Sequence, residues 1–241
     1  MTDLPETSAK EFAATLLPLY HGPTVKIRIS SSDHEYEISK HLLYKESIYF
    51  TTMFESNFAE GQQQVATLEE VEGVVSVRSF EALIKWLYLR RIQLDSEGPE
   101  DQISGAIELV RLADMCHITG IEAQMAQYIK DVLVANPGPQ CDIFCSRPID
   151  TNTYYLTRQH IIWATLLPPG HLVRRIIAAA SVEGYLRDEN YKFVQESHEI
   201  PAFGADLLRE VRSTLSQMDS ATQFEDPISG TRMSINCGSD F

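Results

Sequence analysis

The cysteine and histidine residues are the first candidates for chemistry in this chain. Cys141 and Cys145 are four positions apart, as two zinc ligands can be, but a tetrahedral site needs two further nitrogen or sulfur ligands. The nearest histidine is His160, and the remaining cysteines, Cys116 and Cys237, form no second pair. Free thiols in a loop are the simpler interpretation. The sequence therefore predicts no metal site and no bound cofactor.

Motifs of catalytic sites are also missing. The sequence contains no glycine-rich phosphate loop, no Gly-x-Ser-x-Gly and no His-Glu-x-x-His, and its seven histidines are scattered. The run Glu69–Glu72 could be a metal or acid/base cluster, but a solvated acidic loop is the commoner meaning. Ser47 fits the N-cap between two short helices better than a nucleophile. We therefore expect that the protein is not an enzyme and has no catalytic residues.

The elements that would position these side chains follow from the hydrophobic pattern. Val25–Ser30 and Tyr36–Ile38 both alternate apolar and polar residues around a turn-like stretch, which predicts a β-hairpin. Apolar residues then recur at helical steps over residues 40–54, and Gln64–Leu68 is a candidate third strand. The expected core side chains are Leu43, Phe50, Phe54, Phe80, Leu83 and Leu87.

Further helices are expected along the rest of the chain. Ser79 is the expected N-cap of a helix over Phe80–Leu89, and two more helices are predicted over Ile103–Cys116 and Ile121–Val134. Pro201 is expected to precede a last helix, Phe203–Met218. The organisation predicted is a partly helical N-terminal segment, a globular domain, a linker, a helical region and a disordered tail, at 1–20, 21–135, 136–153, 154–218 and 219–241.

Charge and hydropathy limit the classes of partner. Acidic residues outnumber basic ones by 34 to 20, and the resulting net charge of −14 repels phosphate backbones. The pairs Arg90-Arg91 and Arg174-Arg175 are isolated, so direct contact with nucleic acid is not expected. No apolar run reaches the about 18 residues of a membrane helix, and the N-terminus lacks a secretory signal pattern. We expect an intracellular protein, cytoplasmic or nuclear, without membrane contact.

Several short motifs follow one another between Val25 and Ile129. Tyr36–Leu43 precedes Ser47–Phe50, and the further stretches are Met53-Phe54 with Phe58-Ala59-Glu60, Val65–Leu68, Ser79–Tyr88 and Leu109–Asp114. Each motif is weak alone, but their common order over about a hundred residues is fairly specific. In this arrangement the chain resembles the BTB/POZ domain family.

The resemblance implies an α+β fold, with a small three-stranded sheet flanked by a cluster of helices and an α-helical C-terminal region. That region is similar in style to the stand-alone BTB proteins of filamentous fungi, in which an Arg-Arg-containing apolar helix (Leu172–Ala180) precedes a Pro-Ala-Phe step (Pro201–Phe203). Function in this fold comes from surfaces. The resemblance therefore implies a protein–protein interaction module for self-association or partner recruitment.

The same resemblance suggests a docking site. BTB proteins that dock a cullin scaffold of a ubiquitin ligase often carry a hydrophobic-x-Glu motif where this chain has Phe58-Ala59-Glu60. An exposed apolar anchor beside a carboxylate can fill a pocket and fix orientation. The implied partner-binding residues are Met53, Phe58 and Glu60, with a cullin as partner. The alternative is that Phe58 tucks under its loop and Glu60 is only solvated.

A homodimer is also expected, with Phe12, Leu16 and Lys40 at its interface. In many BTB domains a buried Asp before the first strand and the Lys of a His-Lys pair form a charged pocket between protomers. Lys40 matches that Lys, but Thr24 and Ser39 stand at the Asp and His positions. Because an unpaired buried lysine is costly, either Lys40 is exposed or the usual dimer is altered.

Two functions of different class remain open. The protein is either an adaptor that presents a substrate to a cullin-based ubiquitin ligase, or a dimerising scaffold in a nuclear or signalling complex. No kelch array, MATH domain or zinc finger is evident, which weighs against the adaptor. The C-terminal helices either form a partner surface or cap the domain by burying apolar side chains, namely Ile161, Ile162, Trp163, Ile176 and Ile177.

Overall fold

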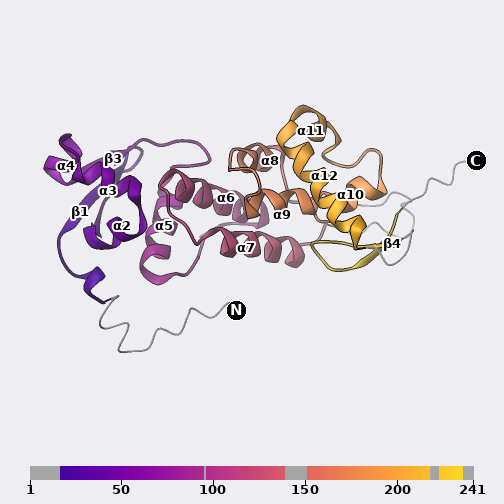
Figure 1. Ribbon diagram of the computed structural model, residues 1–241, viewed down its shortest axis with the longest axis horizontal. Helices are drawn as coiled ribbons and strands as arrows, with labels where there is room; N and C mark the ends of the chain where they lie inside the picture. Colours follow the sequence, from indigo (N-terminus) through magenta and orange to yellow (C-terminus); the bar gives the residue numbers. More distant parts are fainter. Residues whose placement is uncertain (1–16, 95, 139–150, 218–222, 236–241) are drawn as a thin grey trace, which may run out of the picture. The chain divides into compact units, whose positions relative to one another are not determined.

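The computed structural model describes residues 17–94, 96–138, 151–217 and 223–235, which form two compact units (Figure 1). The first unit holds the chain up to residue 95 together with 108–121, and the second holds 96–107 and everything after 121. Helix α6 (Pro99–Met115) contributes residues to both units. The described ends of the linker expected at 136–153 lie inside the second unit.

A three-stranded sheet in the order β2-β1-β3 forms the base of the first unit. Strand β1 is antiparallel to β2 and parallel to β3, so β1 is the central strand. Its apolar residues Val25, Ile27 and Ile29 are fully buried and alternate with exposed ones, which confirms the predicted hairpin and third strand. The strands are β1 (Thr24–Ile29), β2 (Glu35–Ser39) and β3 (Val65–Leu68).

Short helices connect these strands and complete the core of the first unit. Ser47 caps α3 as predicted, because its Oγ accepts the N–H of Phe50 at 3.2 Å while donating to the carbonyl of Cys116 at 2.6 Å. The predicted core residues, Leu43, Phe50, Phe54, Phe80, Leu83 and Leu87, are each at most 2% exposed. The elements are the 3₁₀ helix η2 (Leu17–Tyr20) and helices α2 (Lys40–Glu46), α3 (Ile48–Glu55), α4 (Ala59–Gln63) and α5 (Val77–Leu89).

The starts of helices α5 and α6 differ from the sequence prediction. Helix α5 begins at Val77, because Ser76 is the N-cap, and Ser79 instead closes a reciprocal capping box with it. Helix α6 begins at Pro99 rather than Ile103, because proline suits a first turn that needs no N–H donor. The residues Pro99–Asp101 therefore belong to the helix.

The second unit consists mainly of helices. Helix α9 packs against both α7 and α12. Ile161 and Ile177 are buried as predicted, whereas Ile162, Trp163 and Ile176 are only partly buried. The elements are α7 (Glu122–Ala135), α8 (Arg158–Thr165), α9 (Leu172–Ala180), α10 (Val182–Arg187), α11 (Val194–Glu199), α12 (Pro201–Ser216), β4 (Gln223–Glu225) and β5 (Arg232–Ser234). Helix α12 starts at Pro201 itself, which occupies its first turn.

The prediction of a disordered tail is wrong for residues 223–235. Strands β4 and β5 pair antiparallel, and Phe224 and Ile228 are at most 2% exposed. The side chain of Asp226 organises the turn, because its Oδ2 accepts both the N–H and the hydroxyl of Ser229 at 2.7 Å, and its Oδ1 accepts the amide of Asn152 at 3.0 Å. Buried apolar and polar contacts thus outweigh a composition that favours disorder.

Among the described residues, no helix combines the length and hydropathy needed to span a bilayer.

Candidate partner-binding site

A surface groove of about 480 Å³ lies where helices α3 and α4 meet in the first unit. Met53, Phe58 and Glu60, the residues predicted from the sequence, all line it. The groove also contains residues that the sequence prediction missed, namely Ile48, Tyr49, Thr52, Ser56 and His117. Ile48 and Thr52 are four residues apart on α3, and Tyr49 is four residues before the predicted Met53, so helical spacing could have identified these three. No local pattern points to His117, which comes from the turn after α6.

The anchor of this groove is exposed. Phe58 is 76% exposed and Ile48 63% exposed, so Phe58 does not tuck under its loop. Phe58 occupies the N-cap position of α4, and Glu60 lies in the first turn of that helix. Among the described residues no cation forms an ion pair with Glu60. The groove therefore offers two apolar side chains and an uncompensated carboxylate to a partner.

The corner that carries Phe58 is fixed by hydrogen bonds. The side-chain amide of Gln64 donates to the carbonyl of Phe54 at 3.0 Å and to the carbonyl of Gly61, joining the ends of α3 and α4. Gln64 itself has the left-handed φ of 56°. Gly61 allows the close approach, because a Cβ there would lie 1.9 Å from the carbonyl oxygen of Ser56. Phe58 is thus presented on a preorganised support.

Of the residues expected at a dimer interface, Lys40 is the one that the structure describes. Lys40 is partly exposed, and its Nζ lies 5.2 Å from the ring centre of Tyr44. Ser39 is 4% exposed and donates to the carbonyl of Leu19, while Thr24 donates to Glu37 at 2.6 Å. Lys40 is therefore not an unpaired buried charge. Phe12 and Leu16 lie outside the described residues.

A buried Ser–His contact in the second unit lacks the geometry of a catalytic dyad. Ser104 Oγ lies 2.7 Å from His160 Nε2, but His160 Nδ1 accepts the N–H of Thr157 at 3.1 Å. The neutral ring therefore carries its proton on Nε2, which cannot then accept the serine proton. Burial, and next the charge of Lys192, lower the pKa of His160 to about 4. We interpret this histidine as part of the capping box of α8.

The described residues offer little to a metal ion or a redox reaction. They contain no group of three or more His, Cys, Asp or Glu that could hold a metal. Cys116 is fully buried, and burial raises the pKa of its thiol to about 12. It is therefore an unreactive core residue. Cys141, Cys145 and Cys237 lie outside the described residues.

Comparison with known families adds to this geometry. The model of the BTB/POZ domain matches residues 4–133, more than half of the 241-residue chain. The chain belongs to the BTB/POZ domain family. The observed sheet and helix cluster are the α+β fold expected of a BTB domain, and domains of this family serve as protein–protein interaction modules. No curated protein sequence matches the chain significantly.

The BTB match also extends into the second unit. It reaches residue 133 and so covers most of α7, and α9 packs on α7 within that unit. Helix α9 is strongly amphipathic, and its residues Val173, Ile177 and Ala180 are fully buried. The C-terminal helices therefore bury apolar surface of the BTB-matched helix α7, as expected of a cap.

Proposed function

We propose that this BTB protein is an interaction adaptor that docks a cullin-type scaffold of a ubiquitin ligase through the groove of Met53, Phe58 and Glu60. The observation that carries the proposal is the 76% exposure of Phe58 on a corner held by Gln64 and Gly61. A solvent-exposed phenylalanine gains about 1.5–3 kcal/mol when a partner buries it. Phe58 and the exposed Ile48 line the same groove, and exposed apolar side chains that lie together often mark a protein–protein contact.

The charge of the groove supports a specific kind of contact. The carboxylate of Glu60 has no basic partner among the described residues, so it is available to a cation of the scaffold. Such a pair would orient the docked partner, and the phenylalanine would supply most of the affinity. We propose an intracellular location, cytoplasmic or nuclear, because cullin scaffolds act there.

A binding measurement with a purified cullin N-terminal fragment tests the proposal. We expect the full chain to bind, and the double variant Phe58→Ala/Glu60→Ala to lose at least about 2 kcal/mol of binding free energy. A control is Leu166→Ala, which removes another exposed apolar side chain, 63% exposed, from the second unit. Absence of binding by the wild type would overturn the adaptor proposal. Equal binding by the double variant would overturn the assigned site.

Self-association is the second function we propose. Leu17 is 41% exposed at the first described residue of the chain, and Tyr20 stacks on Tyr88 with ring centres 5.6 Å apart. The described turn Leu17–Tyr20 is therefore anchored at Tyr20 and exposes Leu17, an apolar side chain that could contact a second copy. Light scattering over a range of concentrations tests this, and a strict monomer would contradict the scaffold function.

A further inference from the structure

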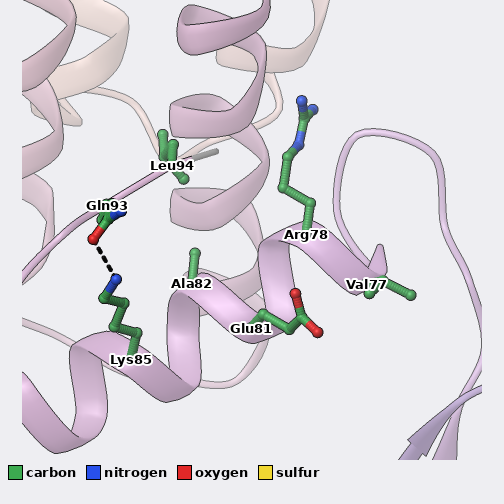
Figure 2. Close-up of a pocket in the computed structure, with 7 residues that line it drawn as sticks. All are labelled: Val77, Arg78, Glu81, Ala82, Lys85, Gln93 and Leu94. Atoms are coloured by element: carbon green, nitrogen blue, oxygen red, sulfur yellow. Dashed lines mark hydrogen bonds between the residues drawn. The ribbon is translucent and has the colours of Figure 1, made fainter. Parts of the chain in front are cut away.

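A second hollow of about 330 Å³ lies in the first unit, between helix α5 and the segment Arg91–Leu94 (Figure 2). Its apolar floor is formed by Ala82 and Leu94, which are 6% and 9% exposed. Arg78 and Lys85 extend from α5 on either side of Ala82, as Figure 2 shows. The hollow therefore has an apolar centre, with the cationic side chains of Arg78 and Lys85 and the carboxylate of Glu81 around it.

The charge of Lys85 is not neutralised within the described part of the chain. Glu81 lies one turn before Lys85 on α5, the spacing that normally favours an ion pair. However, the Glu81 carboxylate accepts the hydroxyl of Tyr36 at 2.9 Å, and Lys85 Nζ donates only to the uncharged amide oxygen of Gln93. Arg78, in contrast, pairs with Glu108 at 2.9 Å. Lys85 is therefore the side chain that can accept an external carboxylate.

The segment beside the hollow resembles an unpaired strand. Its exposure alternates, with Arg91 and Gln93 exposed and Ile92 and Leu94 less so. Within the described residues, no backbone N–H or C=O of Arg91–Leu94 forms a hydrogen bond. Such an edge can pair with an added extended chain. Arg91 forms no ion pair with a described carboxylate either.

We propose that this hollow binds an extended acidic peptide of a partner protein. One carboxylate of the peptide pairs with Lys85, an apolar side chain covers Ala82 and Leu94, and the peptide backbone pairs with Arg91–Leu94. Charge complementarity identifies the occupant, because Lys85 in the hollow and Arg91 beside it form no ion pair with a described carboxylate, on a chain whose net charge is −14. This surface is separate from the Phe58 groove, so the proposal does not rest on cullin docking.

Fluorescence anisotropy with the full chain tests the proposal. The probes are a labelled peptide of alternating valine and glutamate and its counterpart of alternating valine and glutamine. Lys85→Met removes the charge but keeps most of the aliphatic stem, and Gln93→Glu gives Lys85 a carboxylate within the chain. The matched controls are Lys45→Met, at an exposed lysine of α2, and Phe58→Ala in the other groove.

We expect the wild type to bind the glutamate peptide at least about fivefold more tightly than the glutamine peptide at low salt. Lys85→Met and Gln93→Glu should abolish this preference, and both controls should retain it. No binding of the glutamate peptide by the wild type up to about 1 mM would overturn the proposal. So would a preference that survives in Lys85→Met, or one that Lys45→Met loses equally.

Discussion

His160 is expected to make the stability of the second unit depend on pH. The side chain is 1% exposed, and its Nδ1 must stay unprotonated to accept the N–H of Thr157 in the capping box of α8. Burial first, and the positive charge of Lys192 second, lower its pKa from 6.5 to about 4. Protonation would place an imidazolium in the core and break the cap. Folding therefore favours the neutral ring.

The sign and size of the effect follow from linkage. Between pH 6.5 and about 4 the unfolded chain binds a proton at this position and the folded chain does not. The free energy of unfolding therefore rises with pH across this window, and the contribution is complete above pH 6.5 and lost near pH 4. A shift from 6.5 to about 4 corresponds to about 3 kcal/mol, at about 1.4 kcal/mol for each pKa unit.

Chemical denaturation followed by circular dichroism, at several pH values, measures this contribution. The test variant is His160→Asn, whose amide oxygen can accept the Thr157 N–H but does not titrate. When the pH falls from neutral to about 4, the free energy of unfolding of the wild type should decrease by about 3 kcal/mol more than that of this variant. His198→Asn, at an exposed histidine of α11, should follow the wild type. Identical pH dependence of wild type and His160→Asn would refute the reasoning.

Three further substitutions test other parts of the structure. Gly61→Ala should lower the free energy of unfolding by about 1–3 kcal/mol and weaken cullin binding, because its Cβ would lie 1.9 Å from a carbonyl oxygen at the end of α3. The control Gly98→Ala should leave both quantities unchanged, because a Cβ there would have no atom within 4 Å. In the wild type the guanidinium of the buried Arg174 lies 2.7 Å from the Asp206 carboxylate. Asp206→Ala removes this counter-charge and should lower the free energy of unfolding by about 3–5 kcal/mol. A loss under about 1 kcal/mol would contradict the buried pair. Phe224→Ala should lower the free energy of unfolding by about 3–5 kcal/mol, because the side chain is buried. An unchanged denaturation midpoint would show that the β4–β5 hairpin is not packed against the rest of its unit.

The strands and core of the first unit could be predicted because their signals are local. Val25, Ile27 and Ile29 alternate with polar residues, and Phe50 and Phe54 are one helical turn apart, so burial follows directly from periodicity. Helix α4 could not be predicted in the same way. Its sequence, Ala-Glu-Gly-Gln-Gln, has no apolar stripe, and its position depends on the Gln64 side chain and on the close contact at Gly61.

The C-terminal hairpin was missed for a related reason. Its composition is polar, and its order comes from long-range contacts, since Asp226 bonds to Asn152 and Lys130 donates to the carbonyl of Pro227 at 3.3 Å. The groove was only partly predictable. Phe58 and Glu60 are close in sequence, so a motif could identify them, whereas His117 reaches the groove only through the fold.

Amide hydrogen exchange of the full chain, alone and with a cullin N-terminal fragment, tests the central proposal most directly because it locates the contact. Docking at the Phe58 groove predicts slower exchange across α3 and α4 and around His117. It predicts no change at the α5 hollow around Lys85 or in α8–α12. Protection confined to those other regions, or no change anywhere at saturating fragment, would contradict the account.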